Sequence, residues 1–199
     1  MLASLGGRFS ARAMSVITHA NVNQDRLSGQ FGHDEFHFDN NAFEKTGAYI
    51  EEQRALVVSS LKLGDTNSAW QAFGRFLHSA QDFYAHSNYI TLWVDRFDEK
   101  TLPPAPNIDP ADLSLIQSPD LRSGKVYYPF ELLYFFRKTR NFSLRILPRD
   151  SHAWMNLDSP AQGFKFEYAM QAAIKRTVIE FDKTTEGFSE GMCRLFLDS

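Results

Sequence analysis

Apolar residues recur at helical spacing along much of the chain. In residues 42–63 alanines, leucines and a tyrosine alternate with charged residues, which predicts an amphipathic helix. Gly64 suits the position that ends this helix, and Asp65 or Thr66 can cap the next one. Residues 67–86 carry apolar side chains on most sides, a pattern typical of a buried helix at the centre of a bundle.

The second half of the chain is less regular. Six of the eight prolines fall in residues 99–129, which excludes a continuous helix there and predicts a long loop with one short helix at 110–117. Residues 130–137 are strongly apolar and fit a short helix or a strand. A last long helix is expected over residues 161–183, followed by a further helical turn or two. The pattern as a whole predicts an all-α helical bundle with a long Pro-rich loop.

Composition narrows the class of protein. A length of 199 residues suits a single domain, and we expect residues 21–199 to form one helical domain. The single cysteine, Cys193, excludes a disulfide framework within the chain and a Cys-rich zinc site. A net charge of −3 and a pI near 6.1 argue against nucleic acid as a partner. No apolar run approaches the roughly 20 residues of a membrane-spanning helix.

The N-terminal region gives little information. The first 24 residues contain no acidic residue and carry Arg8 and Arg12 among Ser, Ala and Gly. We interpret residues 1–20 as an uninformative tail, with a weak organellar presequence as the alternative. The sequence does not assign a compartment.

Two imidazoles and a carboxylate share one stripe of the predicted central helix. His78, Asp82 and His86 are spaced four residues apart, so at about 100° per residue their directions span roughly 80°. Gly74, one turn earlier, leaves space above the stripe. Burying three unpaired ionisable groups is costly, and a divalent cation would satisfy all three. Nitrogen and oxygen ligands fit zinc, with manganese or iron as alternatives. The competing interpretation is a set of polar core residues or a wet helix face.

A second polar cluster, HDEFHFDN, precedes the helix predicted from residue 42. His33 and His37 are four residues apart, as are Glu35 and Asp39. A helical turn places His33 and His37 on one face, whereas an extended segment places all four together. A polar turn with no site is an equal alternative. His152 is isolated in the sequence, and we expect it to be structural or on the surface.

Three strings resemble the Het-C family, the heterokaryon-incompatibility proteins of fungi and their bacterial and animal relatives. They are HFDN at 37–40, the helical segment at 42–74, and LHSAQDFYAHSNY at 77–89. The Het-C group in turn resembles the zinc-dependent phospholipases C and single-strand nucleases, which are all-helical enzymes that hold three zinc ions. The resemblance therefore implies a bundle of the phospholipase C type.

This resemblance implies roles for five residues. His78 and Asp82 match a His and an Asp one turn apart on the family's central helix, and His86 matches a further His. His37 matches the His of an HF–D string. Asp25, within ANVNQD, matches an Asp that bridges two metals. All five are expected to be metal ligands, and Asp25 and Asp82 are also the expected catalytic residues.

The third metal site of that family is poorly matched. His19 is a doubtful equivalent of its early His, and its later His and Glu fall at or near Lys165 and Ala169. We therefore expect one to three zinc ions, with two as the main expectation.

The implied chemistry is hydrolysis of a phosphate ester by a metal-activated water, with phospholipid head groups favoured. Two ions about 3.5–4 Å apart would clamp the attacking and leaving oxygens, and Glu35 or Asp39 would supply a proton. An aromatic mouth contacting a membrane surface is one interpretation, and core packing is the other, for Phe83, Tyr84, Tyr89, Trp93, Tyr127, Tyr128 and Phe130. The alternative functions are a non-catalytic Het-C-like metal-binding or signalling module and, less favoured, a single-strand nuclease.

Overall fold

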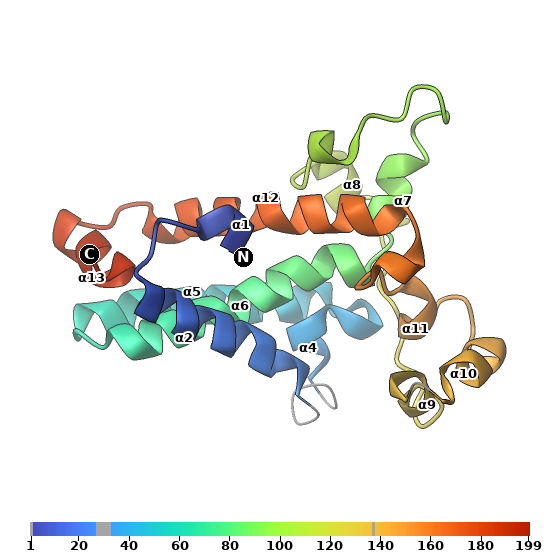
Figure 1. Ribbon diagram of the computed structural model, residues 1–199, viewed down its shortest axis with the longest axis horizontal. Coiled ribbons are helices and arrows are strands. Elements are labelled where there is room, and N and C mark those ends of the chain that lie inside the picture. Colours follow the sequence, from blue (N-terminus) through green and yellow to red (C-terminus); the bar gives the residue numbers. More distant parts are fainter. Residues whose placement is uncertain (1, 27–32, 137) are drawn as a thin grey trace. The chain divides into compact units, whose positions relative to one another are not determined.

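The computed structural model describes residues 2–26, 33–136 and 138–199, and its regular structure in these ranges is helical (Figure 1). The described residues contain no strand, and their β-type pairing is limited to isolated bridges at Ser87–Ser123 and Lys125–Ser151. The fold is therefore all-α, as predicted. A search of the described helices finds none whose length and apolarity would let it cross a membrane.

The chain divides into two compact units whose segments alternate along the sequence. The first unit comprises residues 1–37, 44–81 and 173–199, and the second comprises residues 38–43 and 82–172. The expectation of a single domain over residues 21–199 stays a prediction.

The first unit is formed by long helices. Its complete elements are α1 (Leu2–Leu5), α2 (Ala11–Val22), η1 (Asn23–Asp25), α4 (Asp34–His37) and α13 (Glu190–Leu197). It also contains most of α5 (Phe43–Lys62), of α6 (Thr66–His86) and of α12 (Lys165–Thr185). The bounds of the three longest helices agree with the stretches predicted at residues 42–63, 67–86 and 161–183 within a few residues.

Helix α6 supplies the core of this unit. Phe73 and Phe76 are fully buried. The side chain of Gln81 donates to Thr177 of α12 at 2.8 Å, and Arg75 donates to Gln53 of α5 at 2.8 Å. Helices α5 and α12 therefore both pack on α6, as the pattern of apolar residues indicated.

Helix α2 also packs on α6. A side chain at Gly74 would meet the carbonyl oxygen of Ile17 at 2.3 Å, so the two backbones are in direct contact. The space that we inferred above the stripe is thus filled by α2 (Figure 1). Ala13 and Ile17 are fully buried, and the hydroxyl of Ser10 caps the helix by accepting from the amide of Ala13. Half of the expected tail at residues 1–20 is therefore a packed helix.

The second unit is formed by short helices and loops. Its elements are η2 (Asp39–Asn41), α7 (Tyr89–Val94), η3 (Ala105–Asn107), α8 (Leu113–Ile116), α9 (Leu132–Phe135), α10 (Arg140–Ile146), α11 (His152–Met155), η4 (Pro160–Gln162) and the adjoining ends of α6 and α12. Helix α8 lies within the short helix predicted at 110–117, and the apolar segment at 130–137 includes a helix, not a strand.

Tyrosine hydroxyls hold the Pro-rich loop in this unit. Tyr84 donates to the carbonyl of Pro110 and Tyr89 donates to that of Asp109, each at 2.6 Å. Four of the aromatic residues considered for a mouth are buried in the core, namely Phe83, Tyr84, Tyr89 and Trp93. Tyr128 and Phe130 are exposed.

Candidate functional site

Three predicted ligands come together in the first unit. One ligand atom each from Asp25, His37 and His78 lies within 4.8 Å of the others. The Nε2 atom of His78 is 3.2 Å from Nδ1 of His37 and 3.6 Å from Oδ1 of Asp25. Both imidazoles are buried, whereas the Asp25 side chain is 57% exposed. This first cluster is a buried pair of rings with a carboxylate at its solvent edge.

The local structure explains which side chains join the first cluster. The chain leaves α2 through η1, which ends at Asp25, and α4 ends at His37. His33 lies outside the cluster, because its ring stacks on Phe36 at 4.6 Å and its Nδ1 lies 3.1 Å from Glu35. Of the histidines in the segment before residue 42, only His37 therefore joins the first cluster.

A second group of ligands lies in the second unit. Ligand atoms of Asp39, His86 and His152 are within 4.8 Å of one another, and all three residues are buried. The Oδ1 atom of Asp39 is 2.9 Å from Nδ1 of His152 and 3.8 Å from Nδ1 of His86. Oδ2 of Asp82 is 4.0 Å from the same nitrogen of His86. Asp39, His86 and His152 are called the second cluster below.

Further polar groups surround the second cluster. Nε2 of His86 lies 3.1 Å from Oδ2 of Asp158, and Asn156 donates to the same oxygen at 2.8 Å. Burial lowers the pKa of His86, but the negative charges of Asp158, Asp82 and Asp39 outweigh it and hold that pKa well above its ordinary value. The surroundings of His86 are therefore strongly negative and favour a positive charge.

Sequence reasoning missed two members of this cluster. His152 looked isolated because its partners are distant in sequence. Asp39 was considered as a proton donor and as one of four polar residues that an extended segment would place together, but not as a partner of His86. Asp158 also went unnoticed as a partner of His86, whose Nε2 its carboxylate contacts. Neither position suggested for a third metal supplies a ligand: Lys165 donates to Thr91, and Ala169 is a buried apolar residue.

An extended segment of the Pro-rich loop positions the second cluster. The amide of Gly124 donates to the carbonyl of His86 at 2.9 Å, and its own carbonyl accepts from the amide of Asn40 at 2.8 Å. The carbonyl of Lys125 accepts from the amide of His152 at 2.9 Å. Two consecutive loop residues thus tie together the backbone segments that carry all three ligands.

The turn that carries Asp39 is held by asparagines. Asn40 and Asn41 have φ values of 54° and 58°, in the left-handed region that asparagine tolerates better than most residues. Oδ1 of Asn41 accepts from the amide of Ser123 at 2.7 Å, and Oδ1 of Asn40 accepts from that of Val126 at 2.9 Å. These bonds fix the orientation of η2 and with it the carboxylate of Asp39.

Helix α11, which carries His152, is anchored by a buried acid. Oε1 of Glu131 accepts from the amide of Ala153 at 2.6 Å. Burial raises the pKa of Glu131, and the bond from Ala153 opposes that rise. This contact fixes the first turn of α11 and therefore the ring of His152.

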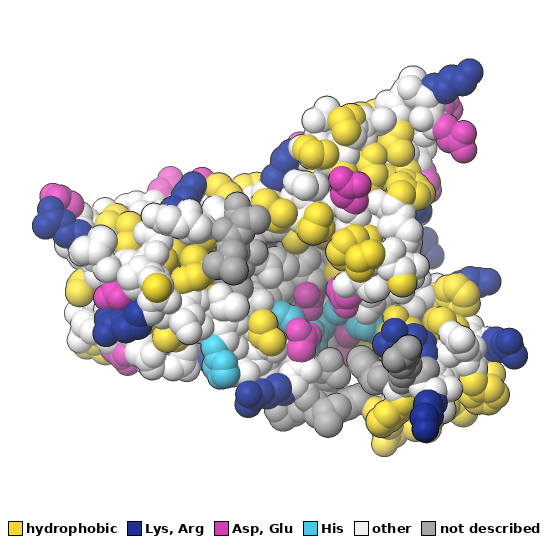
Figure 2. All heavy atoms as spheres, viewed as in Figure 1, with side chains coloured by type: hydrophobic (Ala, Val, Ile, Leu, Met, Phe, Trp, Pro, Cys, Tyr) yellow, Lys and Arg dark blue, Asp and Glu magenta, His cyan; other side chains and the backbone are white. Residues whose placement is uncertain are grey.

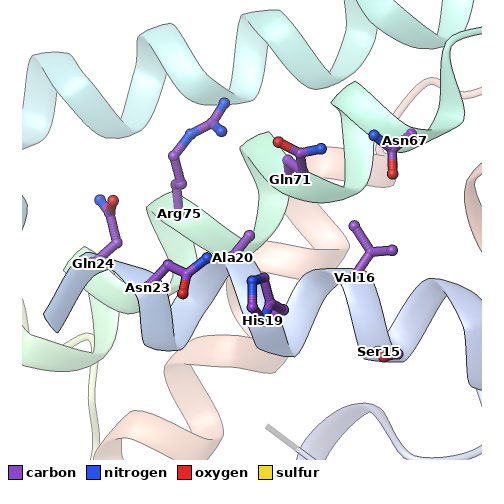
Figure 3. Close-up of a pocket in the computed structure, with 9 residues that line it drawn as sticks. All are labelled: Ser15, Val16, His19, Ala20, Asn23, Gln24, Asn67, Gln71 and Arg75. Atoms are coloured by element: carbon purple, nitrogen blue, oxygen red, sulfur yellow. The ribbon is translucent and has the colours of Figure 1, made fainter. Parts of the chain in front are cut away.

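A polar pocket of about 560 Å³ lies on the first unit. Two of the residues that line it are close in sequence to residues of the first cluster. Gln24 precedes Asp25 and Arg75 stands one turn before His78. Figure 3 shows Arg75 extending from α6 toward α5, where its Nε donates to Gln53. The pocket is lined by Ser15, Val16, His19, Ala20, Asn23, Gln24, Asn67, Gln71 and Arg75.

The surface charge agrees with the composition. On the face drawn in Figure 2, the Lys and Arg side chains of the described residues are interspersed with acidic and apolar ones and form no continuous basic band.

Comparison with known proteins gives the family. A model of the VWA7 N-terminal domain matches residues 3–113. The von Willebrand factor A domain-containing protein 7 of Rattus norvegicus is 30% identical over 94 residues, which are 45% of this chain and 10% of the rat protein. The match therefore spans only a small part of that relative. No solved structure matches the chain.

These matches correct the resemblance drawn from short strings. The matched range contains the strings HFDN and LHSAQDFYAHSNY, so the residues that suggested the Het-C family lie in a VWA7 N-terminal domain. Assignment to Het-C and its phospholipase relatives is wrong, and roles derived from it lose their basis. The candidate ligands are now supported by their geometry alone. Because the family model covers more than half of the chain, the protein belongs to the VWA7 N-terminal domain family.

Proposed function

We propose that this domain is a metal-dependent hydrolase of phosphate esters that uses a divalent cation, most simply zinc, at the first cluster. The observation that supports the proposal best is the convergence of Asp25, His37 and His78, with the imidazoles buried and the carboxylate at the solvent edge.

The spacing of the first cluster fits a shared ion. Atoms that bind one zinc ion at about 2.0–2.1 Å lie roughly 3–4 Å from each other, depending on the angle between them. The separations of 3.2 Å between His37 and His78 and 3.6 Å between His78 and Asp25 fall in this range. Three protein ligands of this type leave a coordination position for water or substrate, as in catalytic zinc sites.

The chain's own groups have distinct roles in this proposal. When bound, the cation lowers the pKa of water and polarises a phosphoryl oxygen. His37 and His78 donate nitrogens from a buried setting, which excludes competing water on one side. Asp25 is exposed, so its second oxygen can accept a proton from the attacking water.

A pocket on the same unit supports a phosphate-bearing substrate. Arg75 is one turn from His78 and lines the pocket together with amide side chains. A guanidinium recognises phosphate through paired hydrogen bonds, and the bond to Gln53 restricts its motion. The net charge of −3 favours a small ester or a lipid head group over a nucleic acid.

The test is turnover by zinc-loaded protein. We expect release of nitrophenol from bis(p-nitrophenyl) phosphate or p-nitrophenyl phosphate, or of head group from phosphatidylcholine vesicles, abolished by chelator and by His78→Ala. His33→Ala, a histidine outside both clusters, is the matched control and should retain activity. Folded, zinc-replete protein that turns over none of these substrates would contradict the hydrolase and leave a cation-binding module.

A further inference from the structure

We propose that the second cluster is a second divalent-cation site, with Asp39, His86 and His152 as ligands and Asp82 as the fourth donor. Asp82 and His86 were expected from the sequence to bind metal, but not together with Asp39 and His152 at a site of their own. It is argued from the geometry of the second unit and does not depend on hydrolysis at the first cluster.

The distances between ligand atoms in the second cluster fit a shared ion better than they fit a set of direct hydrogen bonds. The bond of 2.9 Å between His152 and Asp39 is an ordinary hydrogen-bond distance. The separations of 3.8 Å and 4.0 Å from Nδ1 of His86 to Asp39 and Asp82 are too long for direct bonds. Atoms sharing one ion lie roughly 3–4 Å apart. The separations from Nδ1 of His86 to these two carboxylates are therefore those of atoms that share one ion.

The other nitrogen of His86 is held as metal-binding histidines usually are. Its Nε2 lies 3.1 Å from Oδ2 of Asp158, and Asn156 donates to that oxygen at 2.8 Å. A carboxylate on the far nitrogen fixes the tautomer of a ligating histidine, orients its ring and raises its basicity. The proton is thereby placed on Nε2, which leaves Nδ1 as the electron-pair donor facing Asp39 and Asp82.

The charges of the cluster require compensation. The side chains of Asp39 and Asp82 are 9% and 13% exposed, and Asp158 adds a third carboxylate around two imidazoles. Charges removed from water are tolerated when they are paired or coordinate a metal. One protonated histidine balances one of the two charges that are largely removed from water, those of Asp39 and Asp82, whereas a divalent cation balances both.

The backbone holds the ligands in place before any ion binds. Gly124 and Lys125 make hydrogen bonds to the backbone of His86, Asn40 and His152, as described above. Ligands fixed by such a framework bind an ion without paying the entropy of ordering three segments. Because all three ligands are buried and a fourth donor is close by, the site has the closed character of a structural zinc site.

Counting bound ions tests this inference. Protein stripped of metal and reloaded with zinc is weighed by native mass spectrometry, and cobalt substitution reports tetrahedral geometry by its visible absorption. We expect two ions in the wild type, one in His152→Gln and one in His37→Gln. His19→Gln, an exposed histidine outside both clusters, should retain two. A wild type with a single ion that His152→Gln retains at unchanged affinity would overturn the second site.

A variant outside the ligand set guards against loss of folding. If His152→Gln is unfolded by circular dichroism, Asp158→Asn replaces it, since that side chain is 51% exposed and is not a ligand. We expect it to weaken binding of one ion about 10–100-fold, and unchanged affinity for both ions would refute the site. Two bound ions without turnover would contradict the hydrolase and support this inference, so the two failures are distinguishable.

Discussion

The amide nitrogen of Gly124 donates to the carbonyl oxygen of His86 at 2.9 Å, at the C-terminal end of α6. A side chain at Gly124 would meet the Cα of His152 at 2.6 Å, so the loop passes directly against the first residue of α11. One glycine of the Pro-rich loop is therefore in contact with the backbones of two ligands of the second cluster. The arrangement of that cluster depends on the absence of a side chain at this position.

Replacing Gly124 by alanine should separate these backbones. Because the obstructing atom is a Cα and not a flexible side-chain end, we expect a loss of about 1–3 kcal/mol in the free energy of unfolding. Binding of one ion should weaken as well, and both effects are measurable by chemical denaturation and by zinc titration. Gly47→Ala is the control: it has open space in α5, and the higher helix propensity of alanine should stabilise the protein by up to about 1 kcal/mol. Equal stability of Gly124→Ala and wild type would show that the loop adapts.

The long helices could be predicted from the sequence because their signals are local. The spacing of apolar residues and a glycine after the helix, at Gly64, gave α5 and α6 within a residue or two at each end. The same periodicity indicated that His78, Asp82 and His86 share one helix. These inferences need only the geometry of a single helix, which neighbouring residues determine.

The second cluster could not be predicted because it is assembled by contacts distant in sequence. The prolines of the loop excluded a helix at residues 99–129, but they carry no information on where Gly124 would lie. His152 joins Asp39 only because Lys125 and Glu131 hold α11 in place. The family assignment was wrong for a different reason. It rested on short histidine-containing strings, whereas the family match extends over residues 3–113.

A second glycine controls the packing of α2 on α6. A Cβ at Gly74 would lie 2.3 Å from the carbonyl oxygen of Ile17 and 2.9 Å from the Cβ of Ala20. Alanine favours a helix by about 1 kcal/mol over glycine, but here the clash with backbone should dominate. We expect Gly74→Ala to destabilise the protein by about 1–3 kcal/mol, measured by thermal unfolding. Gly191→Ala, on α13 with open space around it, should be neutral or stabilising. A stabilised Gly74→Ala would mean that α2 does not pack on α6 in solution.

The buried carboxylate of Glu180 should make the free energy of unfolding depend on pH. Its side chain is fully buried and forms ion pairs with Arg54 and, at 2.6 Å, with Arg176. Burial raises the pKa of Glu180, but the two guanidinium groups outweigh burial and lower that pKa below its ordinary value of 4.5. A carboxyl group whose pKa is lower in the folded state stabilises the fold above the pKa of the unfolded chain. That contribution is lost as the pH falls through the folded-state pKa.

We therefore expect Glu180→Gln to cost about 3–5 kcal/mol near neutral pH, because it leaves two arginines without their buried partner. The difference from wild type should shrink as the pH falls from the ordinary pKa of 4.5 through the lower folded-state pKa, where the wild-type carboxyl group takes up its proton. Urea unfolding from pH 7 to pH 3 measures both effects. Glu190→Gln is the matched control, since Glu190 pairs with Arg194 on a helix but is 80% exposed and should change stability by about 1 kcal/mol or less. A pH-independent difference would contradict the predicted titration.

Metal binding at the first cluster should raise the melting temperature of the protein. An ion that binds only the native state stabilises it by about 2.7 kcal/mol when the free ion is at 100 times its Kd. For a chain of this size that corresponds to a rise in Tm of roughly 5–10 °C. The Tm of metal-loaded wild-type protein should fall when chelator is added. The Tm of His78→Gln should fall by less, because only the second cluster of this variant still binds an ion. In chelator the two proteins should unfold at similar temperatures, since Gln preserves much of the buried volume of His78. His33→Gln should respond to chelator like the wild type. A wild-type Tm that chelator leaves unchanged would exclude ions at both clusters, because no native-state ligand would then be lost.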